Sequence, residues 1–118
     1  MLRGEIRYLQ IPTVDVGASA SFYERALGWT IRTRSDGSTG FDDTTAQVSG
    51  EWVLDRQAAG DTGVLVYVRV DDVEASLERI AEAGGEIIVP RTRQDEAIAY
   101  ATFRDPAGNV LGIFQEHG

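Results

Sequence analysis

Hydrophobic and polar positions along the chain predict strands and helices in a repeated order. Residues 5–13 and 64–70 are rich in β-branched and aromatic side chains, which favour strands. An acidic residue suited to capping a helix follows each of them: Asp15 in the first case, and Asp71 or Asp72 in the second. Apolar residues at helical spacing come next in both places. Each half of the chain therefore begins with a strand and a helix.

Glycines end both predicted helices, at Gly28 and at Gly84–Gly85. Strands are predicted directly after them, at 29–34 and 86–92. In the second half, Asp105-Pro106-Ala107-Gly108 fits a type I turn, with proline at the second position and glycine at the fourth. Each half thus contains a strand, a helix and three further strands.

A shift of 57 positions superposes one half of the chain on the other. It places Asp15 on Asp72, and without a gap it carries Val53-Leu54 onto Val110-Leu111. The two copies, at about 1–59 and 60–118, fill a single domain of 118 residues. We therefore expect an α+β fold made of two βαβββ modules.

Charge and composition limit the partners of this domain. Eleven basic and 19 acidic residues give a net charge of −8, which repels phosphate backbones and anionic lipid headgroups. We therefore expect neither nucleic acid nor a membrane as a partner. The chain has no cysteine, no long apolar run, and a charge too early for a signal peptide, so we expect a cytoplasmic protein.

Strand alternation predicts which side chains face away from the helices. In 64–70 the valines share one face, which must be the helix-covered side, so Leu65 and Tyr67 point the other way. The shift of 57 gives Tyr8 and Gln10 as their counterparts in the first copy. The last strand adds Val110, Gly112 and Phe114 to this open face, and the same shift makes Val53 the counterpart of Val110 and Asp55 the counterpart of Gly112.

The arrangement of several short motifs resembles the vicinal oxygen chelate superfamily, which includes glyoxalase I, bleomycin-resistance proteins and extradiol dioxygenases. The motifs are Asp15, Phe22-Tyr23, Leu27-Gly28-Trp29, Val70-Asp71-Asp72-Val73 and Asp105-Pro106-Ala107-Gly108-Asn109. The resemblance spans nearly the whole chain. It implies paired modules that form a cupped mixed sheet, usually in a homodimer.

The resemblance also implies where a divalent metal ion would bind, since the metalloenzymes of the family hold it near the first and last strands of each module. The corresponding positions here are Tyr8, Asp55, Leu65 and Gly112. Only Asp55 is a competent ligand at neutral pH, because leucine and glycine have no side-chain donor and a phenol is a poor one. We therefore expect no metal and no cofactor, although the amide oxygen of Gln10 offers one further donor.

The drug-sequestering branch of the family is the nearest functional model. It implies a small organic ligand, cationic or aromatic and antibiotic-like, bound in a concave cleft without metal. The candidate ligand-binding residues are Tyr8, Gln10, Trp29, Trp52, Asp55, Leu65, Tyr67, Gly112 and Phe114. The two tryptophans suit either ligand stacking or the core.

Two other classes of function stay open. One is an enzyme of the same superfamily: a metal-dependent lyase, isomerase or dioxygenase, or a cofactor-free proton-transfer enzyme in which Asp55 is the catalytic base. The other is an interaction module whose cleft is filled by a partner chain.

Overall fold

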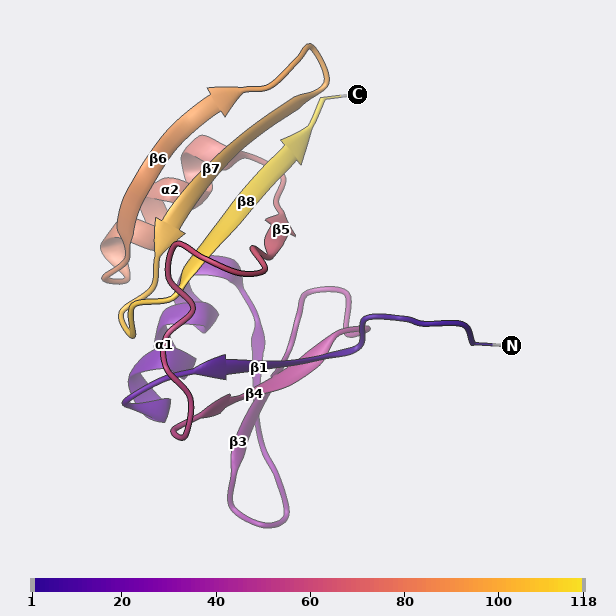
Figure 1. Ribbon diagram of the computed structural model, residues 1–118, viewed down its shortest axis with the longest axis vertical. Helices are drawn as coiled ribbons and strands as arrows, with labels where there is room; N and C mark the ends of the chain where they lie inside the picture. The colour runs from indigo at the N-terminus through magenta and orange to yellow at the C-terminus, as the bar shows by residue number, and fades with distance from the viewer. Residues whose placement is uncertain (1, 118) are drawn as a thin grey trace.

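The computed structural model describes residues 2–117, which form two modules with the same order of elements (Figure 1). The first module contains β1 (Tyr8–Pro12), α1 (Val16–Leu27), β2 (Thr30–Thr33), β3 (Thr39–Asp42) and β4 (Ser49–Val53). The second contains β5 (Tyr67–Arg69), α2 (Val73–Glu82), β6 (Glu86–Arg93), β7 (Ile98–Arg104) and β8 (Val110–Glu116). The expectation of an α+β fold built from two βαβββ modules is confirmed.

Each module has its own four-stranded mixed sheet. The strand order is β1-β4-β3-β2 in the first sheet, called sheet A below, and β5-β8-β7-β6 in the second, called sheet B. The first and last strands of each module run parallel, and the other neighbours run antiparallel. β1 and β5 are therefore edge strands, and they do not pack on each other.

Acidic caps and glycines position the two helices as the sequence predicts. The side chain of Asp15 accepts a hydrogen bond from the backbone N–H of Ala18, and Asp72 accepts one from Ala75. Asp72, not Asp71, is thus the cap of α2. Gly28 adopts a φ of 73° in the left-handed region, where glycine is the residue without a steric penalty.

The segment before β5 is more exposed than its alternation predicts. Regular pairing begins only at Tyr67, and Val64, expected on the helix-covered face, is 87% exposed. Val68 and Val70 do pack against the core. The expected alternation of buried and exposed side chains therefore holds within β5. It fails in the residues before β5, which still belong to the connection from β4.

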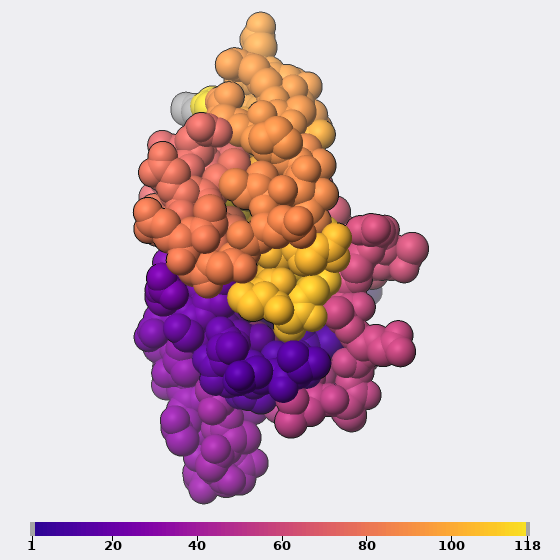
Figure 2. Space-filling model, turned by 90° about the vertical axis from the view of Figure 1, so that its left-hand side faces the viewer, coloured from indigo at the N-terminus to yellow at the C-terminus, as the bar shows by residue number. Residues whose placement is uncertain are grey.

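The two modules share one hydrophobic core, and the turn between β7 and β8 joins them. Phe22 of α1 lies against Phe103 of β7, with ring centroids 6.0 Å apart. The hydroxyl of Tyr23 donates to the buried carboxylate of Asp105 at 2.7 Å, and the side chain of Asn109 donates to the carbonyl of Pro12 at 2.7 Å. Figure 2 shows this yellow turn lying between the indigo first module and the orange part of the second.

No helix within residues 2–117 is long and apolar enough to span a bilayer.

The contact between Tyr23 and Asp105 gives a prediction about stability. Tyr23→Phe removes the donor and leaves a buried carboxylate oxygen with one partner fewer, so the free energy of unfolding should fall by about 1–3 kcal/mol. Urea denaturation followed by tryptophan fluorescence measures this change. Tyr100→Phe, whose hydroxyl takes no part in this contact, is the matched control and should change stability far less.

The same contact predicts a dependence on alkaline pH. Burial, followed by the charge of Asp105 and the hydrogen bond to it, raises the pKa of Tyr23 well above the ordinary value of 10.0. The stabilisation is therefore complete below pH 10 and is lost as the pH rises above it, because the unfolded tyrosine releases its proton first. The Tyr23→Phe variant should lose less stability over this range than the wild type does.

Candidate functional site

The faces of the two sheets that point away from the helices differ in chemistry. The open face of sheet A is polar, with Tyr8, Gln10, Arg34 and Glu51 joined by hydrogen bonds. The open face of sheet B is aromatic and hollowed. A ligand site built from these faces therefore combines a hydrogen-bonded half and an apolar half.

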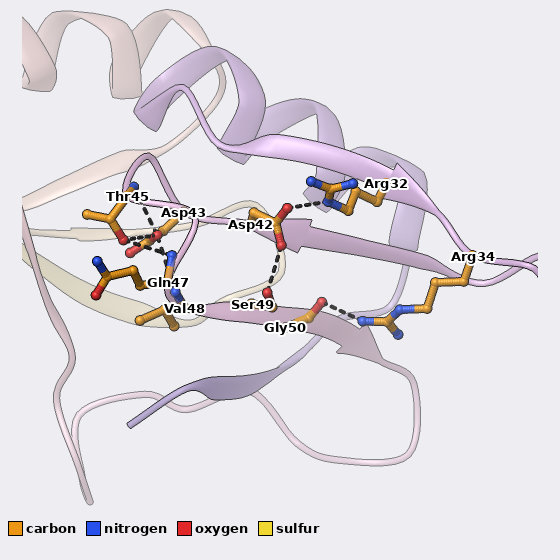
Figure 3. Close-up of polar contacts among 9 residues, drawn as sticks. All are labelled: Arg32, Arg34, Asp42, Asp43, Thr45, Gln47, Val48, Ser49 and Gly50. Carbon is orange, nitrogen blue, oxygen red and sulfur yellow. Dashed lines mark hydrogen bonds and ion pairs between the residues drawn. The ribbon is translucent and has the colours of Figure 1, made fainter. Parts of the chain in front are cut away.

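Arg34, just after β2, extends across the open face of sheet A. One of its terminal nitrogens, Nη2, donates to the hydroxyl of Tyr8 at 2.6 Å and to the carbonyl of Gly50 at 3.1 Å. The other, Nη1, donates to Glu51 at 3.3 Å. Figure 3 shows the guanidinium reaching the Gly50 carbonyl. Burial opposes the charged form, and the contacts with Tyr8 and Glu51 outweigh it, so that the pKa of Arg34 is raised.

Gly40 of β3 provides the space that this guanidinium occupies. A Cβ at position 40 would lie 2.5 Å from Nη2 of Arg34 and 2.8 Å from the carbonyl oxygen of Gly50. Real side chains do not approach this closely, so any larger residue must displace Arg34 or the strand.

Glu51 of β4 is the acid at the centre of the polar face. The hydrogen bond from Gln10, 3.1 Å long, acts against the effect of burial, and with smaller contributions from Tyr8 and Arg34 it holds the pKa of Glu51 below its ordinary value. Glu51 is therefore ionised at neutral pH and is a weak base.

A second ion pair lies farther along the same face, between Arg32 and Asp42 (Figure 3). Ser49 donates to the other oxygen of Asp42 at 2.7 Å, and this bond, followed by the contact with Arg32, lowers the pKa of that carboxyl. Each arginine on the open face of sheet A is thus matched by one carboxylate.

The open face of sheet B contains a hollow of about 470 Å³, which we call the aromatic hollow. Its lining residues are Tyr67, Thr92, Arg93, Gln94, Ile98, Tyr100 and Phe114. The rings of Tyr67 and Tyr100 meet edge to face, with centroids 6.3 Å apart. Tyr67 and Phe114, both expected at a ligand site, are therefore brought together, and Tyr100 joins them from β7.

Gly112 does not line the aromatic hollow. It lies directly beneath the ring of Tyr67. A Cβ at position 112 would lie 2.3 Å from the ring of Tyr67. The ring therefore fills the volume that a side chain at position 112 would need.

A second hollow, of about 510 Å³, separates the segment around β5 from the first module. Leu65 and Trp29, two of the expected ligand residues, border this hollow and not the aromatic one. Tyr67 borders both. Four of the expected residues, Tyr67, Phe114, Leu65 and Trp29, are thus divided between the two hollows.

The placement of Asp55 at the metal position of the first module is wrong. Gln10 pairs with Glu51 in sheet A, and its counterpart Tyr67 pairs with Gly112 in sheet B, so Glu51 is the counterpart of Gly112. The true offset at the last strand is 61 positions, because the β6–β7 hairpin is longer and contains register shifts. Asp55 lies after the end of β4 and is exposed.

Of the two roles left open for Trp29 and Trp52, ligand stacking and the core, the packing of both side chains favours the core. In β4, Trp52 points to the helix side, opposite to Glu51, and it is 5% exposed. Trp29 stacks between Tyr23 and Phe41, with centroid distances of 4.7 and 4.5 Å. Both indoles therefore contribute to the core of the first module.

The residues at the four family metal positions do not fit a divalent ion. Tyr8 and Glu51 are both engaged by Arg34, while Leu65 and Gly112 have no donor atom. Nowhere in the described chain do three histidine, cysteine, aspartate or glutamate side chains gather closely enough to hold a metal. Stable sites for such ions need several fixed donors.

Comparison with known proteins identifies the family. A model of the Glyoxalase/Bleomycin resistance protein/Dioxygenase superfamily matches residues 5–113, and the chain belongs to this superfamily. The anthracycline biosynthesis protein DnrV of Streptomyces peucetius is 29% identical over 132 residues, which cover 96% of this chain and 47% of DnrV. Relatives from Mycobacterium bovis and Mycobacterium tuberculosis are matched over 46% of their length. The chain thus spans about half the length of these curated relatives.

Solved structures share the fold over nearly the whole chain. A superfamily member from Sphaerobacter thermophilus DSM 20745 has a TM-score of 0.80 at 18% identity, covering 98% of this chain and 100% of its own. TnmS3, an antibiotic binding protein from Streptomyces sp. CB03234, has a TM-score of 0.73 at 23% identity and is covered to 99%, as is this chain.

The space around Arg34 gives a prediction. Gly40→Ala should lower the free energy of unfolding by about 1–3 kcal/mol, because the new methyl group overlaps the guanidinium and the Gly50 carbonyl. Gly60→Ala, where no atom lies within 4 Å of the new Cβ, is the control and should change it by less than about 0.5 kcal/mol. Thermal denaturation measures the stability of both variants. An equal loss of stability in Gly40→Ala and Gly60→Ala would contradict the steric role of Gly40.

Proposed function

We propose that the protein binds a small aromatic organic molecule, of the size of an antibiotic, in the aromatic hollow and without a metal ion. The observation that carries this proposal is the hollow itself: about 470 Å³, on the open face of sheet B, with Tyr67, Tyr100 and Phe114 in its lining. Pockets of a few hundred Å³ with an apolar lining and few polar groups are typical of small-molecule sites.

The polar groups at the hollow favour an aromatic guest that also carries hydrogen-bonding substituents. Thr92, Gln94 and Arg93 line one side of it. The net charge of −8 attracts a cationic guest over a longer range. A guest of this class agrees with the similarity of this chain to DnrV, an anthracycline biosynthesis protein, and to TnmS3, an antibiotic binding protein.

We further propose that the binding unit is a homodimer. The edge strands and the segments beside them expose apolar side chains, among them Ile6, Val64 and Leu65. Unpaired edges with exposed apolar residues are suited to association with another chain. A second copy on these edges would bring the polar face of one sheet A towards the aromatic hollow of the other chain.

Ligand binding is tested by isothermal titration calorimetry with doxorubicin, a planar aromatic cation, and with a neutral anthraquinone. Tyr100→Ala removes one aromatic wall, worth about 1–1.5 kcal/mol, and should weaken binding about tenfold. Val14→Ala, an exposed position outside the hollow, should leave affinity unchanged. Absence of heat with both compounds, or an equal loss in the two variants, would contradict the proposal.

The dimer is tested by size-exclusion chromatography with multi-angle light scattering. The wild type should show twice the chain mass of 12.9 kDa, and Ile6→Glu combined with Leu65→Glu should show the mass of one chain, because two charges would be buried. Val14→Glu is the control, since Val14 is at least as exposed as Ile6 and Leu65 but lies in the loop between β1 and α1. A wild type of 12.9 kDa would exclude the dimer.

A further inference from the structure

We propose that the guanidinium of Arg34 is the resident cation of this site, taking the place between Tyr8 and Glu51 where metal-dependent relatives hold a divalent ion. The inference concerns the metal-free part of the proposed function and does not depend on the identity of the ligand.

The first argument is the set of acceptors around Arg34. A phenol oxygen, a carboxylate and a backbone carbonyl, from β1 and β4, converge on its two terminal nitrogens at 2.6, 3.3 and 3.1 Å. An oxygen-lined position of this kind also suits a hard metal cation. Because the guanidinium is held on both terminal nitrogens, a second cation cannot approach the same oxygens without repulsion.

The second argument is that the chain provides space for this arrangement. Gly40 has no side chain at the point where the guanidinium crosses β3. The side chain of Arg34 is only 34% exposed, against 64% for Arg32, which lies on the same face and reaches only Asp42. A solubilising surface arginine needs neither the glycine nor the three partners.

The third argument comes from the second module. Where sheet A has the Gln10–Glu51 pair, sheet B has Tyr67 over Gly112, so this half contributes an aromatic ring and no charge. Of the two equivalent strand pairs, only the one in sheet A therefore carries a carboxylate, and that carboxylate is bound by Arg34. The charge of Glu51 is balanced within the chain, and the site is preorganised without an ion.

The experiment introduces a strong metal donor and asks whether Arg34 keeps a metal out. Tyr8→His places an imidazole on β1 at the position that shares the Arg34 guanidinium with Glu51, and imidazole and carboxylate are good Ni²⁺ ligands. Isothermal titration calorimetry with NiCl₂ is carried out on Tyr8→His alone and on Tyr8→His combined with Arg34→Ala, Arg34→Lys or Arg32→Ala. Thermal denaturation verifies that each variant is folded.

The proposal predicts at least tenfold tighter Ni²⁺ binding in Tyr8→His/Arg34→Ala than in Tyr8→His. Arg34→Lys retains the charge and should keep the affinity low. Arg32→Ala removes the same charge from the neighbouring Asp42 and should have little effect. Arg34→Gln, which keeps a hydrogen-bonding side chain without charge, replaces the alanine variant if that one does not fold.

Three results would overturn the proposal: no gain in Ni²⁺ affinity on removing Arg34, an equal gain on removing Arg32, or an undiminished gain with lysine at position 34. No organic ligand takes part in this titration. A failure of the doxorubicin experiment and a failure of this one are therefore distinguishable.

Discussion

The relative position of the two modules depends on the hydrogen bonds that the buried carboxylate of Asp105 accepts. Asp105 accepts hydrogen bonds from the hydroxyl of Tyr23, in the other module, and from the side chain and backbone of Asn109. Asn109 in turn bonds to Pro12 at the end of β1. A buried carboxylate without such partners costs several kcal/mol, so the modules must keep the arrangement that supplies them. The positions of sheets A and B, and thus of their open faces, follow from this constraint.

The two open faces show how one repeated unit can acquire two chemistries. The backbone pairing of first and last strand is the same in both modules, and Gln10 with Glu51 corresponds to Tyr67 with Gly112. In the first module the two residues of the pair form a hydrogen bond between polar side chains. In the second module the aromatic ring of Tyr67 packs on Gly112, which has no side chain. The fold therefore fixes the places of the functional side chains, while their identities decide what is bound.

Local signals in the sequence predict the fold well, and the candidate site less well. Asp15, Asp72 and Gly28 mark the helix ends because capping involves residues only a few positions apart. The ungapped shift predicts Asp55 at the place that Glu51 occupies, because it cannot detect the longer β6–β7 hairpin. Alternation along β4 was the available signal, since it separates Glu51 from the buried Trp52. The partners of Arg34 lie 16 to 26 positions away, and no local pattern predicts them.

The ring of Tyr67 on Gly112 also constrains how this protein can change over evolutionary time. A glutamate introduced at position 112 alone would meet that ring, since even its first carbon would lie 2.3 Å away. A metal-binding descendant therefore needs at least two coordinated substitutions, and the intermediate with only one of them is sterically penalised.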